Sequence, residues 1–209
     1  LIGHSFIDKN PNGGRTMMLL LAVAIPATGF LEQHDTKEPA LIAVTTSIEI
    51  NASPREIWKN VIEFPVLAEP VEFIFKTGIA YPVNAEIKGD GVGAIRYCNF
   101  STGAFVEPIT AWDEPTLLAF DVQKNPPTMR EISFYEINAP HLQNYFVSKR
   151  GEFRLTQLSA GKTLLEGTTW YYHDIKPVFY WRLWSDYIIH KIHSRVLEHI
   201  KVSTEKQLG

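Results

Sequence analysis

The sequence predicts an α+β fold, and three features of the chain carry this prediction. A strand followed by a short helix opens the pattern at 44–62, strand-like segments are grouped over 85–173, and one long helical pattern closes it at 177–205. Strands that are grouped between helices, and do not alternate with them, favour an antiparallel sheet over a series of βαβ units. We therefore expect one antiparallel sheet and one long C-terminal helix.

The opening strand and helix have clear local signals. Residues Val44–Ile50, VTTSIEI, alternate in polarity and are rich in β-branched side chains, which is typical of a strand. Ser53 is a good helix N-cap and Pro54 suits the first helical position. We expect this helix to end near Pro65, and a second short helix to follow over Val66–Lys76.

Six further segments alternate in polarity between turn-forming residues and are predicted to be strands. They are Ala85–Lys88, Gly93–Phe100, Phe105–Trp112, Thr116–Gln123, Gly151–Leu158 and Thr163–His173. The stretch Lys124–Arg150 contains several prolines and reads as long connections around a doubtful element at Met129–Ile137. The final helix is expected from about Pro177 to Glu205.

One stripe of this C-terminal helix should face the sheet, because Trp181, Ile188, Ile192 and Val196 recur at helical spacing. Trp184 and Tyr187 lie off the stripe and are expected to contact loops or a partner. Asp186, His190 and His193 form a second stripe. A hydrogen-bonded or solvated face is a more economical interpretation of that stripe than a zinc site.

The order of these elements, and the segment VTTSIEINASPREIWKNVIEF, resemble the START-like, or polyketide cyclase/lipid-transport (SRPBCC), superfamily, to which the birch-pollen allergen belongs. The matching positions are Ile48, Ile50, Ala52, Pro54, Ile57 and Trp58. The resemblance covers roughly residues 43–205. It implies a helix-grip fold, in which a curved antiparallel sheet wraps around the C-terminal helix and encloses a cavity that commonly holds an apolar ligand. The superfamily has no shared catalytic motif to transfer to this chain.

Two full charges, Arg96 and Glu107, interrupt apolar strands on either side of the turn at 101–104. Pairing Cys98 with Glu107 across this hairpin puts both charges on one face, as diagonal neighbours. Pairing Ile109 with Phe120 in the next strand extends that face with apolar side chains and leaves Trp112 on the other one. We therefore expect the charged face to be the inner one. A one-residue bulge would invert part of this assignment.

The hairpin of 151–158 with 163–173 can be treated in the same way. Pairing Leu158 with Thr163 places Glu166, Trp170 and Tyr172 on the more apolar face, which would then point inward. The predicted ligand-binding residues are the inner-face and helix positions together: Arg96, Cys98, Glu107, Ile109, Phe120, Glu166, Trp170, Tyr172, Trp181 and Ile188.

The buried charges allow three interpretations. They form an internal ion pair that fixes the sheet, or they orient the polar end of a ligand, or one of them is a catalytic acid or base. An isolated buried charge would cost several kcal/mol, so pairing or a polar cavity is required. Cys98 is expected to be a small buried hydrophobic residue and not a nucleophile.

Composition excludes several classes of protein. The net charge is −3 and the basic residues are scattered, so we expect no nucleic-acid partner. Cys98 is the only cysteine, which excludes an intrachain disulfide and a cysteine-built zinc site and leaves the cellular compartment undetermined. We expect no metal and no cofactor.

Residues 1–41 are predicted to be an N-terminal extension to a domain at 42–209. Its segment 16–30, TMMLLLAVAIPATGF, is uncharged and contains Pro26. Three interpretations stay open: a segment packed on the domain, a membrane-proximal segment, and a signal peptide. Pro26 and Gly29 argue against one uninterrupted spanning helix.

The expected function is the binding or transport of a hydrophobic or amphiphilic small molecule or lipid in an internal cavity. Segment 16–30 predicts membrane proximity or a homodimer, so the domain could be the soluble part of a membrane-associated protein. The alternatives are a cyclase or dehydratase that uses Glu107 or Glu166 as its acid or base, and an interaction module with a filled interior.

Overall fold

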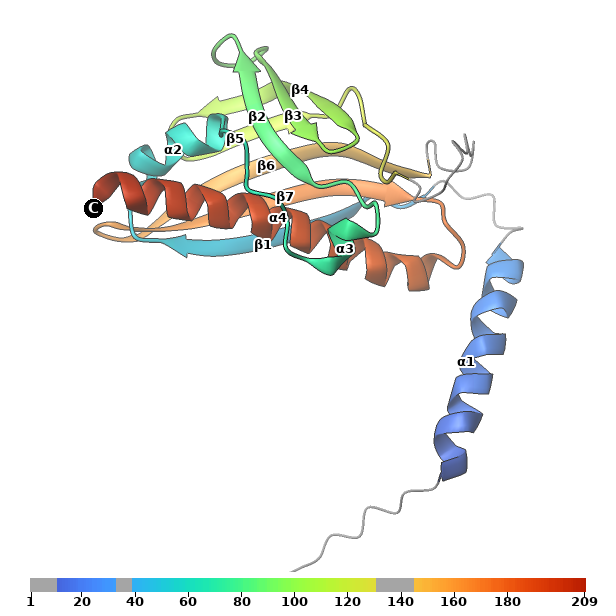
Figure 1. Cartoon of the computed structure of the whole chain (residues 1–209). Coiled ribbons are helices and arrows are strands. Elements are labelled where there is room, and N and C mark those ends of the chain that lie inside the picture. The colour runs from blue at the N-terminus through green and yellow to red at the C-terminus, as the bar shows by residue number, and fades with distance from the viewer. Residues whose placement is uncertain (1–10, 33–38, 131–144) are drawn as a thin grey trace, which may run out of the picture.

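One seven-stranded antiparallel sheet curls around a long C-terminal helix, as the resemblance implies (Figure 1). The computed structural model describes residues 11–32, 39–130 and 145–209. The strand order is β1-β7-β6-β5-β4-β3-β2. The strands are β1 (Ile42–Ile50), β2 (Pro82–Lys88), β3 (Ile95–Phe100), β4 (Gly103–Asp113), β5 (Leu117–Asp121), β6 (Phe146–Ser159) and β7 (Lys162–His173). The helices are α1 (Pro11–Glu32), α2 (Pro54–Ile62), α3 (Phe73–Lys76) and α4 (Val178–Leu208).

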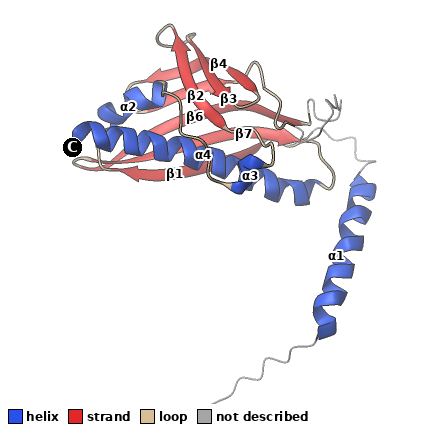
Figure 2. Ribbon diagram, viewed as in Figure 1, coloured by secondary structure: helices blue, strands red, loops and turns tan. Residues whose placement is uncertain are grey.

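The prediction of an α+β helix-grip fold is confirmed, because α4 lies along the concave side of the sheet (Figure 2). The expected element at Met129–Ile137 falls mostly outside the described residues. Ser53 caps α2 as predicted, and its backbone N–H donates to Glu56 Oε2 at 2.7 Å, which completes a capping box.

The predicted helix over Val66–Lys76 is wrong for most of its length, since α3 covers only Phe73–Lys76. Pro70 interrupts the segment, and a proline disfavours helical geometry in the residue before it. Leu67 N instead donates to Val83 O at 2.7 Å, so this stretch runs beside β2.

The register of the first hairpin differs from the prediction by two residues. Arg96 lies directly opposite Glu107, and Cys98 lies opposite Phe105, because the turn is at Ser101-Thr102. A shift of two residues keeps every side chain on its predicted face. The two charges are therefore direct neighbours and not diagonal ones.

A bulge in β4 corrects the prediction for Trp112. Ile109 pairs with Phe120 as expected, but the register then shifts, and Trp112 lies opposite Leu118. The shift turns Trp112 toward the interior, where its ring meets Trp58 edge-on at a centroid distance of 5.8 Å. Its predicted place on the outer face is therefore wrong.

A second bulge, in β6, inverts the predicted faces of β7, while Phe153 and Leu155 of β6 keep their predicted inward face. Gln157, and not Leu158, lies opposite Thr163, so Leu165 and Gly167 point inward while Glu166, Trp170 and Tyr172 point outward. On that convex face, Arg150 stacks over the Trp170 ring at 3.9 Å. The predicted inward orientation of Glu166, Trp170 and Tyr172 is wrong for this reason.

The interior has one solid end. The side chains that fill the space between α2, the sheet and the C-terminal half of α4 are almost fully buried. They include Ile50, Ile57, Trp58, Val61, Leu118, Leu165, Leu197 and Ile200. The opposite end, under the N-terminal half of α4, is the part of the interior that is left for a site.

Helix α1 projects away from the domain (Figure 1). Its C-terminal end lies near the start of α4. It continues through Pro26 and Gly29, so the expectation of an interrupted helix is wrong. The Thr28 hydroxyl lies 2.9 Å from the carbonyl oxygens of both Ala24 and Ile25, in the turn that contains Pro26. Nearly all of its described apolar side chains are exposed.

Candidate ligand-binding cavity

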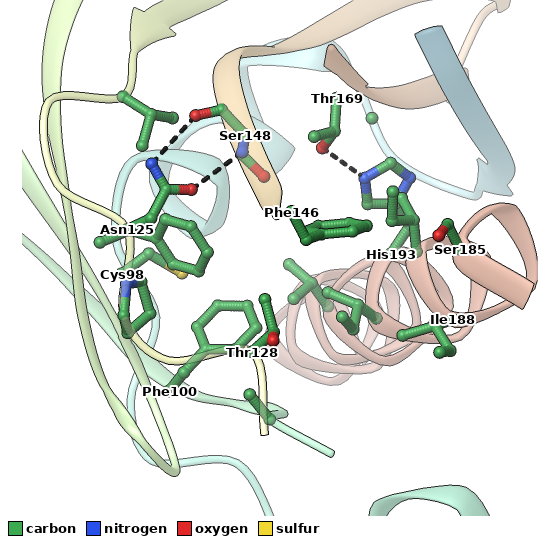
Figure 3. A pocket seen from close by; sticks show the side chains of 18 of the residues that line it. Cys98, Phe100, Asn125, Thr128, Phe146, Ser148, Thr169, Ser185, Ile188 and His193 are labelled. Carbon is green, nitrogen blue, oxygen red and sulfur yellow. Dashed lines mark hydrogen bonds between the residues drawn. The ribbon is translucent and has the colours of Figure 1, made fainter. Parts of the chain in front are cut away.

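A cavity of about 300 Å³ lies between the concave face of the sheet and the N-terminal half of α4 (Figure 3). The sheet contributes side chains from β3 to β7, and the segment 125–129 closes it from the side, next to Ile79 and Ala80. An isolated bridge between Ile79 and Met129 holds these two loops together. The cavity therefore has a floor of strands, a roof of one helix and a lid of loops.

The roof follows the predicted helical stripe. Trp181, Ile188, Ile192 and Val196 all line the cavity. Trp184, which was predicted to lie off the stripe and to contact loops or a partner, also lines the cavity while it remains partly exposed. The aromatic start of α4 therefore forms one edge of the cavity.

The ten predicted site residues divide into three groups. Arg96, Cys98, Glu107, Phe120, Trp181 and Ile188 line the cavity. Ile109 is buried in the adjoining core. Glu166, Trp170 and Tyr172 lie on the convex face and do not line it.

Sequence reasoning missed the residues of the lid and of the rim. Asn125 Nδ2 donates to Ser148 O at 3.1 Å, and Ser148 N donates to Asn125 Oδ1 at 2.9 Å, which ties the lid to β6 (Figure 3). Asn125 precedes Pro126-Pro127. The sequence marks this rigid pair as a break in regular structure but does not show that it forms part of a cavity wall. Phe146 was missed because it falls in the stretch 124–150, which was read as connections although β6 begins at Phe146, and Thr169 was missed because the bulge at Leu158 inverts the predicted faces of β7.

Arg96 and Glu107 form a buried ion pair at the cavity wall. Arg96 is 2% exposed and Glu107 5% exposed, and Arg96 Nη1 donates to Glu107 Oε2. Arg96 Nε donates to Ile62 O at 3.2 Å. The guanidinium also lies 5.4 Å from the ring centre of Phe120 and 5.6 Å from that of Phe153, so it is enclosed by aromatic faces as well as by its partner.

Burial controls the protonation of this cluster. It raises the pKa of the Glu107 carboxyl above its ordinary value, and the neighbouring Arg96 guanidinium opposes that rise. Burial, with a smaller contribution from Glu107, also raises the pKa of the Cys98 thiol to about 12. Cys98 is therefore a thiol and not a thiolate near neutral pH, which does not suit a nucleophile.

Two of the three histidines of α4, His190 and His193, are hydrogen-bonded to the sheet. His193 Nε2 lies 2.8 Å from Thr169 Oγ1, and His193 Nδ1 lies 3.1 Å from Thr46 Oγ1. His190 Nδ1 lies 2.7 Å from the same Thr46 hydroxyl. Burial lowers the pKa of His193 to about 4, so this imidazole is neutral near pH 7.

The third member of that stripe, Asp186, accepts a hydrogen bond from Tyr171 Oη at 2.7 Å. The stripe is thus a hydrogen-bonded face. Within residues 11–32, 39–130 and 145–209, no group of three or more His, Cys, Asp or Glu side chains could hold a metal ion.

Comparison with known proteins rests on structure. No protein-family model matches the sequence, and no curated protein matches it. A point mutant of norcoclaurine synthase from Thalictrum flavum, in complex with a transition-state analogue, aligns with a TM-score of 0.52 and 15% identity over 83% of this chain and 100% of that one. The Zhui aromatase/cyclase from Streptomyces sp. R1128 aligns with a TM-score of 0.51 and 12% identity over 81% of this chain and 97% of that one.

Identities this low establish the fold alone. Both alignments extend over nearly the whole of the solved chain and over more than four fifths of this one. The predicted resemblance is confirmed at this level: the chain has the START-like, or SRPBCC, helix-grip fold.

Proposed function

We propose that this protein binds or carries a hydrophobic or amphiphilic small molecule in the cavity beneath α4. The observation that carries the proposal is the cavity itself, about 300 Å³ in volume and lined mainly by aliphatic and aromatic side chains. Small-molecule sites are typically concave and mostly apolar, with a few convergent polar groups. The two similar structures have this fold, and their names describe a synthase, in complex with a transition-state analogue, and an aromatase/cyclase.

Binding is favoured over the alternative of acid or base catalysis by the predicted carboxylates. Glu107 is engaged with Arg96 inside the wall, and Glu166 lies on the convex face. A general acid or base must come within hydrogen-bonding reach of the reacting group. Glu166 is not placed to do so, and Glu107 lines the cavity but its carboxylate is already engaged by Arg96.

We further propose that the protein works beside a membrane, with α1 in the lipid. Residues Gly14–Glu32 form a helix of 19 residues with a mean hydropathy of 1.5, which is long and apolar enough to cross a bilayer. Only 6% of this helix is buried by the rest of the chain. So much exposed apolar surface requires lipid, a second copy of the chain or another partner.

The position of α1 supports this arrangement. Val178 N, at the start of α4, donates to Glu32 Oε2 at 2.7 Å, so the end of α1 caps the helix that roofs the cavity. Trp181, one turn further along α4, already lines the cavity. Phe179, Leu183 and Tyr187 on the same half of α4 are exposed, so the part of the domain nearest to α1 is rich in aromatic and aliphatic side chains.

The test of binding is native mass spectrometry of the purified full chain. We expect a non-covalent adduct of a small apolar molecule, at one per chain, which is released by organic solvent. Ile188→Trp should abolish the adduct because the larger ring fills the cavity. Leu183→Trp, on the exposed side of the same helix, should retain it. Equal adduct in both variants would place the molecule outside the cavity.

A further inference from the structure

A line of hydrogen bonds leads from the cavity wall to the protein surface. It runs from the Thr169 hydroxyl to His193, then to the Thr46 hydroxyl, and then to His190, over 2.8, 3.1 and 2.7 Å. Thr169 and His193 line the cavity, whereas His190 is exposed (Figure 3 shows the first link). β7, α4 and β1 supply the groups, so the line crosses the seam between the helix and the edge of the sheet.

The chemistry of these groups allows two complete hydrogen-bonding arrangements. A neutral imidazole donates from one nitrogen and accepts at the other, and a hydroxyl can do both. In the first arrangement, His193 Nε2–H donates to Thr169, Thr46 donates to His193 Nδ1, and His190 Nδ1–H donates to Thr46. The Thr169 proton is then not used within the line and can be donated to a molecule in the cavity.

In the second arrangement every bond is reversed. Thr169 donates to His193 Nε2, His193 Nδ1–H donates to Thr46, and Thr46 donates to His190 Nδ1. Thr169 then presents only lone pairs to the cavity and accepts a hydrogen bond from the guest. His193 is neutral in both arrangements, so the change requires no buried charge.

We propose that Thr169 is the point at which the polar end of the guest is recognised, and that the line behind it lets Thr169 act as donor or as acceptor. This inference rests on the proposed ligand-binding function. The guest it fits is an uncharged amphiphile with a carbonyl, hydroxyl or N–H group.

Among the polar groups of the wall, the charged side chains of Arg96, Glu107 and Arg150 and the Asn125 amide already have partners, which supports this assignment. Arg96 and Glu107 neutralise each other, and Arg150 stacks on Trp170 at the convex face. The Asn125 side-chain amide donates to Ser148 O and accepts from Ser148 N. A charged guest would have to break one of these contacts, whereas an uncharged one need only meet Thr169.

The experiment uses three rigid tricyclic probes of nearly the same shape. Fluorene has no hydrogen-bonding group, 9-fluorenone offers a carbonyl acceptor, and carbazole offers an N–H donor. The dissociation constant of each is measured by fluorescence titration of the full chain and of Thr169→Val, which keeps the shape of the side chain and removes the hydroxyl. Comparing each probe between the two proteins cancels its own hydrophobicity.

We expect Thr169→Val to weaken 9-fluorenone and carbazole by about three- to tenfold and to leave fluorene unchanged, which is the effect of one neutral hydrogen bond. Thr45→Val is the matched control, because Thr45 does not line the cavity and its hydroxyl lies exposed on the convex face, 2.8 Å from Thr168 Oγ1. It should change none of the three. Thr169→Ser, which restores the hydroxyl, should recover both polar probes and covers the case in which the valine variant folds poorly.

Breaking the line at Thr46 tests whether the direction of its hydrogen bonds can be reversed. Thr46→Val leaves His193 Nδ1 without its partner, and an unpaired N–H is rarer in protein interiors than an unpaired acceptor. His193 should then hold its proton on Nε2, which fixes Thr169 as a donor. The variant should keep the affinity for 9-fluorenone and lose affinity for carbazole.

The outcomes separate the two proposals. If fluorene does not bind the wild-type chain, the ligand-binding function fails. If fluorene binds but Thr169→Val affects all three probes equally or none, the function stands and the recognition role of Thr169 is overturned. If Thr46→Val weakens both polar probes alike, the reversible line is overturned.

Discussion

Arg96 on β3 and Glu107 on β4 lie directly opposite each other on adjacent strands, and both are buried at the boundary between the solid core and the cavity. The pair is neutral as a unit, which lets two charges remain in an apolar interior. The additional bond from Arg96 to Ile62 O links the pair to the end of α2. We interpret it as a structural pair that fixes the wall of the cavity.

The first prediction concerns this pair. Glu107→Ala should lower the free energy of unfolding by about 3–5 kcal/mol, because it leaves a buried guanidinium without its partner. Glu107→Ala combined with Arg96→Met should lose less, since the second change removes the unpaired charge. Urea unfolding of both variants is the measurement. A double variant as unstable as the single one, or more so, would show that the charges do not depend on each other.

The second prediction concerns Gly151 on β6. A Cβ atom at this position would lie 2.6 Å from Phe120 Cζ, too close for any real contact. Phe120 lines the cavity, so we expect Gly151→Ala to push its ring into the space for the guest and to weaken fluorene binding at least several-fold.

Gly167→Ala is the matched control on the neighbouring strand, because its Cβ would meet Phe153 at an ordinary 3.5 Å. Gly167 itself lines the cavity, so its added methyl group should weaken binding slightly, and less than Gly151→Ala does. Adding Phe120→Leu to Gly151→Ala should restore part of the affinity. Undiminished binding by Gly151→Ala alone would mean that the guest does not occupy the space beside Phe120.

The third prediction concerns pH. His193 has a pKa of about 4 when folded, against an ordinary value of 6.5, so the unfolded chain binds more protons between these two values. The contribution of His193 therefore destabilises the fold as pH falls from 6.5 to 4, by at most about 3 kcal/mol, and is constant above 6.5.

Urea unfolding of the wild type and of His193→Gln at pH 7.5 and 4.5 is the measurement. The variant should lose less stability between the two pH values. The raised pKa of Glu107 acts in the opposite direction, but it is present in both proteins and cancels in the comparison. Identical losses in the two proteins would show that His193 is not buried in its neutral form.

The fourth prediction concerns the N-terminal extension. Deleting residues 1–41 should leave the domain folded, because β1 begins at Ile42, with a loss of about 1 kcal/mol from the missing Glu32 cap. The deletion should abolish flotation with phosphatidylcholine liposomes, which we expect of the full chain. An unfolded deletion variant would show that the extension belongs to the core.

Light scattering on the same two proteins separates lipid from self-association. If the full chain is dimeric in detergent-free buffer and does not float, α1 is a dimer contact and the membrane proposal fails. Flotation that survives the deletion would transfer the membrane contact to the exposed start of α4, where Trp184 and Tyr187 are the next residues to change.

Periodicity and capping residues were sufficient to predict most of the fold. The alternation in Val44–Ile50, the Ser53-Pro54 helix start and the apolar stripe of α4 are local signals, and each has its expected place. Where a prediction was wrong, a second rule operated within the same segment. Pro70, for example, confines the helix predicted at 66–76 to Phe73–Lys76.

The site was harder to predict because strand faces depend on register. Glu166, Trp170 and Tyr172 were placed inside by a pairing that the bulge at Leu158 shifts by one residue, which turns each side chain to the opposite face. Because of the same shift, Thr169 was assigned to the outer face and was not predicted as a site residue. In contrast, the error in the first hairpin was two residues, so Arg96 and Glu107 kept their predicted face. A bulge has no reliable sequence signal when no glycine marks it.

Nuclear Overhauser contacts from bound fluorene to side-chain methyl groups would locate the small apolar molecule that we place in the cavity beneath α4. We expect contacts to Ile188 and Ile192 on α4 and to Val122 beyond β5, which line the cavity from opposite sides. Contacts confined to exposed methyl groups such as those of Leu183 and Val71, with none to Ile188 or Val122, would contradict this placement.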